Sequence, residues 1–169
     1  MSINSESLDL ALKLEEKGHD YYTTHYKKTK NPLAKSVLKS LAEQELDHIE
    51  TFKQIAEGKD ISSDAVQGTD IESTAKKVFE DFSDKEKEDW AEEDTEVYEH
   101  AMELENDIYE HYKKLAEETD DPEEEEFFKA LMKEEMNHYE SLQNVLYYLT
   151  DNVNWLAEEE GKVWNWMTL

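Results

Sequence analysis

Hydrophobic residues recur every three or four positions along most of the chain, which is the spacing of the buried face of a helix. Four long stretches show this pattern. The predicted long helices cover residues 5–29, 32–57, 84–118 and 122–150. A shorter helix is predicted over residues 71–82, inside the segment that joins the second long helix to the third.

Residues that favour helix starts agree with these limits. Asn31 precedes Pro32, and Asp121 precedes Pro122. Each pair places a capping side chain before a proline, whose missing N–H costs nothing at the first helical position. Residues 83–86 form the capping box Ser-Asp-Lys-Glu, which could open the third long helix.

The chain contains an internal repeat. A shift of 90 positions aligns residues 8–57 with residues 98–147 without a gap, and 11 of the 50 aligned pairs are identical. Both prolines of the protein fall in register. Each half therefore reads as one helical hairpin.

The segment between the two hairpins, residues 59–82, is long enough to run the length of a bundle and to set the third helix parallel to the second. One long crossover of this kind is typical of the ferritin-like four-helix bundle. We therefore predict an all-α, ferritin-like bundle over residues 1–150. Residues 151–169 are expected to form a short tail packed on the bundle or on a second subunit.

Charged and imidazole side chains interrupt the hydrophobic stripe near the middle of each long helix. The second and fourth helices each carry a Glu and a His three residues apart, and the first and third each carry a single Glu. These residues are Glu15, Glu45, His48, Glu105, Glu135 and His138. Burying unpaired carboxylates is costly, and no Lys lies at the stripe positions that flank them.

A pair of divalent cations would compensate for this buried charge. Three residues along a helix turn about 300° and rise about 4.5 Å, so the Glu and His of each pair point to one side and can share an ion. Two Glu-x-x-His pairs with two single Glu residues form the ligand set of di-iron and di-manganese carboxylate proteins. In this interpretation the two pairs hold one side of the metals, while Glu15 and Glu105 bridge or terminate them.

Other acidic and imidazole residues lie near the stripes and are possible ligands. Glu16 adjoins Glu15, but the repeat favours Glu15 because Glu16 aligns with Asn106. Four histidines have no imidazole at the matching position of the other half, and we assign them to packing or to the surface. They are His19, His25, His100 and His111.

The composition of the chain argues against several classes of function. The chain has 44 Asp and Glu residues against 18 basic residues, all of them Lys, for a formal charge of −26. Such a surface argues against binding nucleic acid or anionic membranes. The absence of Cys excludes disulfides, thiol nucleophiles, iron–sulfur clusters and thiolate zinc sites within this sequence. With no secretory signal and no run of about 18 apolar residues, we expect a soluble, cytoplasmic protein.

The segments around the six residues resemble the rubrerythrin-like branch of the ferritin-like di-iron carboxylate superfamily. They are Ala11-Leu12-Lys13-Leu14-Glu15, Glu45-Leu46-Asp47-His48, Ala101-Met102-Glu103-Leu104-Glu105 and Glu135-Met136-Asn137-His138. The resemblance covers most of residues 5–150. It implies a bundle that holds a non-haem di-iron centre, is commonly dimeric, and reduces hydrogen peroxide or reacts with oxygen.

Two features depart from the family pattern. Rubrerythrins proper carry a Cys-rich rubredoxin module, which this Cys-free sequence lacks, so re-reduction is expected to need a separate rubredoxin-like donor. They also have an extra Glu associated with peroxidase chemistry in the third helix. One turn before Glu105 this chain has Ala101 and Met102 instead.

The leading hypothesis is therefore an oxidoreductase of oxidative-stress defence with two iron ions, although manganese or a mixed pair accepts the same ligands. A homodimer is expected. The alternatives are an iron-binding, ferroxidase-type sequestration protein and a helical interaction module whose polar residues only specify register. Tyr22 and Tyr112 lie two helical turns after Glu15 and Glu105. They are either functional, as hydrogen-bond partners of a ligand or as a redox relay, or they are aromatic residues that only pack in the core.

Overall fold

Four long helices form most of the described part of the molecule. The computed structural model describes residues 5–59, 61, 63–68, 71–81, 95–151 and 154. The long helices are α1 (Ser5–Tyr26), α2 (Pro32–Ala56), α5 (Glu96–Glu118) and α6 (Pro122–Thr150). Two short helices, η1 (Ser63–Val66) and α3 (Ile71–Glu80), lie between α2 and α5. These residues contain no strand, which confirms the all-α prediction.

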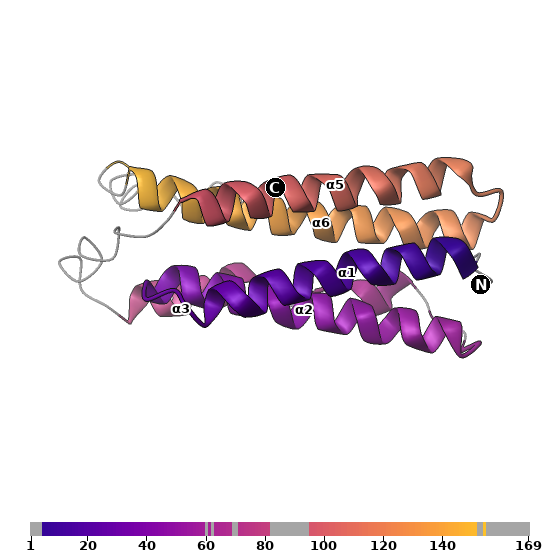
Figure 1. The fold of residues 1–169 in the computed structure, drawn as a ribbon, viewed down its shortest axis with the longest axis horizontal. Coiled ribbons are helices and arrows are strands. Elements are labelled where there is room, and N and C mark those ends of the chain that lie inside the picture. The colour runs from indigo at the N-terminus through magenta and orange to yellow at the C-terminus, as the bar shows by residue number, and fades with distance from the viewer. Residues whose placement is uncertain are drawn as a thin grey trace.

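The helices have the arrangement of a ferritin-like bundle. Figure 1 shows α2 and α5 running in one direction and α1 and α6 in the other. After α2 the chain returns through η1 and α3, which both contact α2, and η1 also contacts α6. The crossover therefore sets α5 parallel to α2, as the length of this segment predicted. None of the described helices is both long and apolar enough to cross a membrane.

The predicted caps of α2 and α6 are confirmed. The Asn31 side chain accepts a hydrogen bond of 3.0 Å from the Ala34 N–H, and the Asp121 side chain accepts one of 2.9 Å from the Glu123 N–H. At the other end of α2, Gly58 has a φ of +79°, a left-handed conformation that suits glycine. Both hairpins thus begin their second helix where the proline pairs indicated.

The third long helix, α5, begins at Glu96, directly after Thr95 in a turn, so the helix predicted over residues 84–118 is interrupted there. The earlier part of that prediction, residues 84–94, lies outside the described residues. The Thr95 carbonyl accepts from the Tyr98 and Glu99 N–H groups, which makes Thr95 the start of the helical hydrogen bonds. Glu96 and Glu99 then suit the positive end of the helix dipole.

Smaller differences lie at two other helix ends. The helix predicted over residues 5–29 ends at Tyr26, where the Lys28 and Thr29 N–H groups both donate to the His25 carbonyl, and α3 ends at Glu80. The capping box at residues 83–86 lies outside the described residues. So does the predicted tail, residues 151–169, apart from Asp151 and Asn154.

Two hydrophobic clusters of the core flank a polar layer. One cluster contains Leu41 of α2 and Leu142 of α6. The other contains Phe52 of α2 and Leu131 of α6. The residues between them on the same helices are the Glu-x-x-His pairs. The polar side chains therefore lie inside the bundle, closed off by packed apolar residues at both ends.

Candidate metal centre

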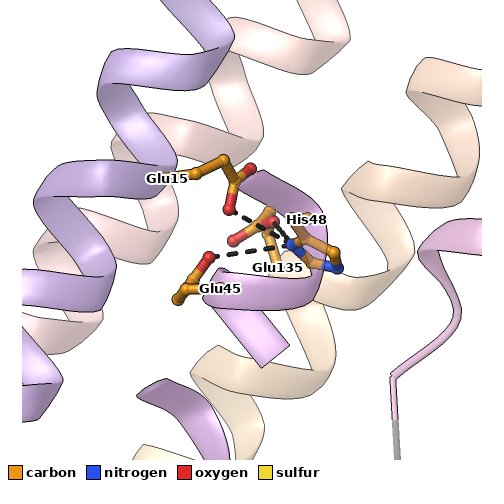
Figure 2. Close-up of side chains that lie close together, drawn as sticks. All are labelled: Glu15, Glu45, His48 and Glu135. Atoms are coloured by element: carbon orange, nitrogen blue, oxygen red, sulfur yellow. Dashed lines mark hydrogen bonds and ion pairs between the residues drawn. The ribbon is translucent and has the colours of Figure 1, made fainter. Parts of the chain in front are cut away.

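The bundle brings all six predicted ligand residues together at its centre. Glu15 comes from α1, Glu105 from α5, and one Glu-x-x-His pair from each of α2 and α6. No member of the set exposes more than 1% of its surface. Figure 2 shows the carboxylates of Glu15, Glu45 and Glu135 gathered around the ring of His48.

The six residues form two overlapping groups of four. In each group, one ligand atom per residue lies within 4.8 Å of the others. Glu15 and His48 belong to one group only, Glu105 and His138 to the other, and Glu45 and Glu135 to both. Of the two roles predicted for Glu15 and Glu105, bridging and terminal, the geometry favours the terminal one, because the Glu of each Glu-x-x-His pair lies between the two groups.

His48 directs one ring nitrogen inward. Its Nδ1 lies 3.2 Å from Glu15 Oε2, 3.7 Å from Glu45 Oε2 and 4.0 Å from Glu135 Oε1. Its Nε2 lies 3.1 Å from the Val66 carbonyl oxygen. Since a carbonyl can only accept, Nε2 carries the proton there and Nδ1 faces the carboxylates.

His138 repeats this orientation from α6. Its Nδ1 lies 3.3 Å from Glu45 Oε1, 3.5 Å from Glu135 Oε2 and 3.6 Å from Glu105 Oε2. The two imidazole rings are stacked, with their centroids 5.9 Å apart. Each group therefore has one inward imidazole nitrogen and three carboxylates.

The two tyrosines support the single glutamates. The Tyr22 hydroxyl donates to Glu105 Oε1, and the Tyr112 hydroxyl donates to Glu15 Oε1. Each tyrosine thus reaches the glutamate of the other half of the repeat. Tyr112 also stacks on Phe128, with ring centroids 6.1 Å apart, so it serves as a core aromatic and as a hydrogen-bond partner at the same time.

Burial and crowding perturb the protonation of the cluster. Burial, reinforced by the charge of Glu15, raises the pKa of Glu45 to about 8. Burial and the neighbouring carboxylates raise the pKa of Glu135 well above its ordinary value. Burial also opposes ionisation of Glu15, but the nearby His48 outweighs it and lowers the pKa of Glu15 to about 2.

The same buried charges shift the pKa values of the histidines and the tyrosines. Burial opposes the charged form of both imidazoles, yet Glu15 beside His48 and Glu105 beside His138 raise both pKa values well above the usual range. Burial and the carboxylates raise the pKa of both tyrosines, which therefore stay protonated as donors. Without a cation, protons have to balance the negative charge.

Unpartnered atoms show that the cluster fits metal ions. Eight buried side-chain atoms have no hydrogen-bond partner within the described part of the chain. Six of them belong to this cluster: both oxygens of Glu45, both oxygens of Glu135, Glu105 Oε2 and His138 Nδ1. Such orphaned groups are costly, and carboxylate oxygens with imidazole nitrogens are the ligands that iron and manganese accept.

The remaining candidates lie elsewhere. Glu16 is exposed, whereas Glu15 is fully buried, in agreement with the repeat. His19 Nδ1 lies 2.8 Å from the Ala42 carbonyl oxygen, and His25 packs against the Tyr21 ring. His100 is exposed and His111 is half-buried, beside Tyr112.

Three contributors to the site do not emerge from the sequence pattern. Gln44 Oε1 lies 3.1 Å from His138 Nε2, and the Val66 carbonyl faces His48. A Cβ on Gly18 would lie 3.2 Å from Glu45 Cδ and Oε1. Gln44 aligns with Glu134 in the repeat, which is a signal that could have found it, whereas a backbone carbonyl leaves no signal in the residue type.

One protein family matches this chain. The sequence model described as Rubrerythrin matches residues 6–146, a range that includes all six residues of the cluster. No curated protein and no solved structure matches the chain.

Proposed function

The chain belongs to the rubrerythrin family of ferritin-like di-iron carboxylate proteins, and on that premise we propose that it is an oxidoreductase with a di-iron centre. Its substrate would be hydrogen peroxide or oxygen, and its role defence against oxidative stress. The observation that carries the proposal is the pair of four-residue groups that share Glu45 and Glu135. Four carboxylates also balance the charge of two divalent ions.

The ligands of each ion follow from the two groups. Glu15 and His48 would hold one ion, Glu105 and His138 the other, and Glu45 and Glu135 would contact both. When bound, two ferrous ions supply one electron each, so that hydrogen peroxide and two protons give two water molecules. Manganese or a mixed pair would fit the same atoms.

The protein itself contributes orientation and exclusion of water. The outward Nε2 hydrogen bonds leave both Nδ1 atoms free to bind metal. The proton on Tyr112 Oη orients Glu15, and the proton on Tyr22 Oη orients Glu105. The apolar clusters on either side keep bulk water from the centre, which strengthens these electrostatic interactions.

A second candidate is an iron-binding, ferroxidase-type sequestration protein without dedicated peroxidase turnover. One observation favours it. Ala101, one turn before Glu105, is fully buried in the apolar core, so that position offers no further carboxylate toward the centre. The extra glutamate associated with peroxidase chemistry in rubrerythrins has no counterpart there.

Turnover also needs electrons. Because this sequence has no Cys, we propose a separate electron donor, such as a rubredoxin-like protein, rather than a thiolate iron centre within these 169 residues. We further propose a homodimer in the cytoplasm. Sedimentation equilibrium of the purified chain measures its oligomeric state directly.

Iron loading followed by peroxide consumption tests the proposal. We expect about two ferrous ions per chain after anaerobic loading, and peroxide consumption linked to their oxidation. The Glu45→Ala, Glu135→Ala double variant removes both shared carboxylates and should lose both properties. Glu43→Ala, on the exposed side of α2, is the matched control.

The outcomes separate the candidates. Less than about one metal per chain in the unmodified protein would contradict both metal-based functions. Two bound ferrous ions with peroxide consumption no faster than that of the double variant would reject peroxide reduction. Oxidation of those ions by oxygen under the same conditions would then support the sequestration candidate.

A further inference from the structure

The outward ring nitrogens of the two histidines have different acceptors. His48 Nε2 faces the Val66 carbonyl of η1, which belongs to the crossover. His138 Nε2 faces the side-chain oxygen of Gln44, which belongs to α2. The first acceptor is fixed backbone, whereas the second is a side chain whose position depends on its neighbours.

Gln44 is buried at the edge of the centre. It exposes 2% of its surface and directly precedes the shared residue Glu45. Its Oε1 can only accept, so His138 Nε2 keeps its proton there and Nδ1 is the nitrogen directed to the carboxylates. A residue that fixes the tautomer of a ligand histidine in this way commonly changes metal affinity by about 10- to 100-fold when it is removed.

The crossover packs tightly against this side chain at Gly68. A Cβ on Gly68 would lie 1.9 Å from Gln44 Oε1 and 2.8 Å from Glu134 Oε2. The Gly68 N–H donates to Glu134 Oε2 at 3.0 Å, which holds the segment after η1 against α6. Gly58 is the one residue of the described chain with a positive φ. Space, rather than backbone conformation, therefore requires glycine at position 68.

We propose that Gln44, held in place by the backbone at Gly68, positions His138 for metal binding, so that the crossover backbone sets the affinity of one of the two ion positions. The inference rests on the metal-binding function proposed above. The position concerned is the one formed by Glu105 and His138 with the shared carboxylates. Gln44 acts through His138 and is a positioning residue, not a ligand.

The type of residue also matters. The repeat places Glu134 where the first half has Gln44, and Glu134 binds a backbone N–H instead of an imidazole. An amide at position 44 accepts a hydrogen bond from the imidazole N–H without adding a fifth negative charge to the four buried carboxylates. The charge balance with two divalent ions is thereby kept.

Four variants test this arrangement with zinc as the probe, because zinc accepts oxygen and nitrogen ligands and suits NMR. Gln44→Ala removes the acceptor, and Gly68→Ala displaces it from a position outside the ligand set. Gln44→Glu keeps an acceptor of similar shape. Gln54→Ala, a partly buried glutamine later on α2, is the matched control.

Zinc affinity is measured by competition with a chromophoric chelator. We expect the unmodified chain to bind two ions, and Gln44→Ala and Gly68→Ala each to weaken one of them by about 10- to 100-fold. Gln54→Ala should bind both ions as the unmodified chain does. Gln44→Glu should weaken neither position by more than about tenfold.

The His138 Nε2 proton gives a readout that does not depend on activity. In ¹⁵N–¹H spectra of the zinc-loaded protein it should be protected from exchange in the unmodified chain and in Gln44→Glu. It should be lost in Gln44→Ala and Gly68→Ala. If Gln44→Ala fails to fold, the exposed Gly68 position still gives the decisive comparison.

The results distinguish this inference from the function on which it rests. An unmodified chain that binds no zinc would contradict both. Two ions bound with unchanged affinity in both Gln44→Ala and Gly68→Ala would overturn the inference and leave the metal site intact. Equal weakening of both ion positions in Gln44→Ala and Gln54→Ala would also overturn it, because general destabilisation would then explain the loss.

Discussion

The two halves of the repeat supply the same candidate ligands but support them differently. Each half offers one single glutamate, one Glu-x-x-His pair and one tyrosine that reaches the opposite half. The residues next to these ligands differ, since Gly18 aligns with Ile108 and Gln44 with Glu134. The ligand layer is nearly symmetric, whereas its surroundings are not.

The crossover explains part of this difference. Its helix η1 contacts α2 and α6, and the Val66 carbonyl of η1 faces His48. The other histidine receives a side-chain acceptor. The two proposed metal positions therefore have equal candidate ligands but unequal support, and variants of matched residues should reveal the difference in metal affinity.

The largest expected effect separates shared from unshared carboxylates. Glu45→Ala or Glu135→Ala should weaken both ions by more than about 100-fold, because a lost direct ligand costs more than a lost supporting contact. Glu15→Ala or Glu105→Ala should weaken mainly one ion. Zinc stoichiometry and affinity, measured on each single variant, check this.

Glu43→Ala is the control for the loss of an acidic residue on α2, because Glu43 pairs with Lys39 at the surface. It should bind both ions normally. The assignment of shared and terminal ligands would be wrong if Glu15→Ala released both ions as readily as Glu45→Ala.

The next largest effect is the pH dependence of the stability of the metal-free protein. The pKa of Glu45 is raised to about 8 in the folded state, above an ordinary value of 4.5. Its contribution to stability is therefore complete below about pH 4.5 and is lost as pH rises through about 8. Between about pH 6 and pH 8 the loss should be about 2 kcal/mol.

Urea unfolding of chelator-treated protein measures this dependence. Glu45→Gln stays neutral and should flatten it, whereas Glu43→Gln should not. The raised pKa values of His48 and His138 act in the same direction, so some slope should remain in Glu45→Gln. Stability of the metal-free chain that rises between about pH 6 and pH 8 would contradict the expected sign.

Local sequence rules accounted for much of the fold and for the cluster of buried charged residues. Proline pairs located the starts of α2 and α6 because capping is a short-range interaction. The six candidate ligands were recognisable because charged residues in a hydrophobic stripe need compensation. The turn at Thr95, by contrast, was not predicted, because no Gly or Pro marks that position in the sequence.

The supporting contacts could not be predicted for a different reason. The Val66 carbonyl and the space at Gly18 and Gly68 depend on which segments meet in three dimensions. Gln44 could have been noticed from its alignment with Glu134, but its partner His138 is 94 residues away. Hydropathy and spacing contain no information on such pairings.

Removing one tyrosine hydroxyl should have a smaller effect than removing a carboxylate. Tyr112→Phe removes the hydrogen bond to Glu15, and Tyr22→Phe removes the one to Glu105. Hydrogen bonds to charged groups contribute about 1.5–3 kcal/mol, so each variant should weaken the binding of one ion by about 10- to 100-fold. Zinc competition should locate the two losses at different positions.

Tyr98→Phe is a suitable control, because Tyr98 is a buried tyrosine of the apolar core on α5. It should leave zinc affinity unchanged. A loss of the same size at both ion positions in Tyr112→Phe and in Tyr22→Phe would show that the tyrosines stabilise the bundle as a whole and do not orient individual glutamates.

The smallest expected effect tests the difference between Gly18 and Ile108. A Cβ on Gly18 would lie 3.2 Å from Glu45 Cδ and Oε1, so Gly18→Ala requires the carboxylate to move by a few tenths of an ångström. Alanine in place of glycine within a helix stabilises by about 1 kcal/mol. We therefore expect metal-free Gly18→Ala to be as stable as the unmodified chain or slightly more stable. Its zinc affinity should fall by about three- to tenfold at both positions, because Glu45 is shared.

Lys17→Ala, an exposed change on the same helix, should leave the zinc affinity unchanged. Higher stability with unchanged zinc affinity would mean that Gly18 is not needed to make room for Glu45, and the asymmetry of the two halves would then reside in Gln44 and the crossover alone.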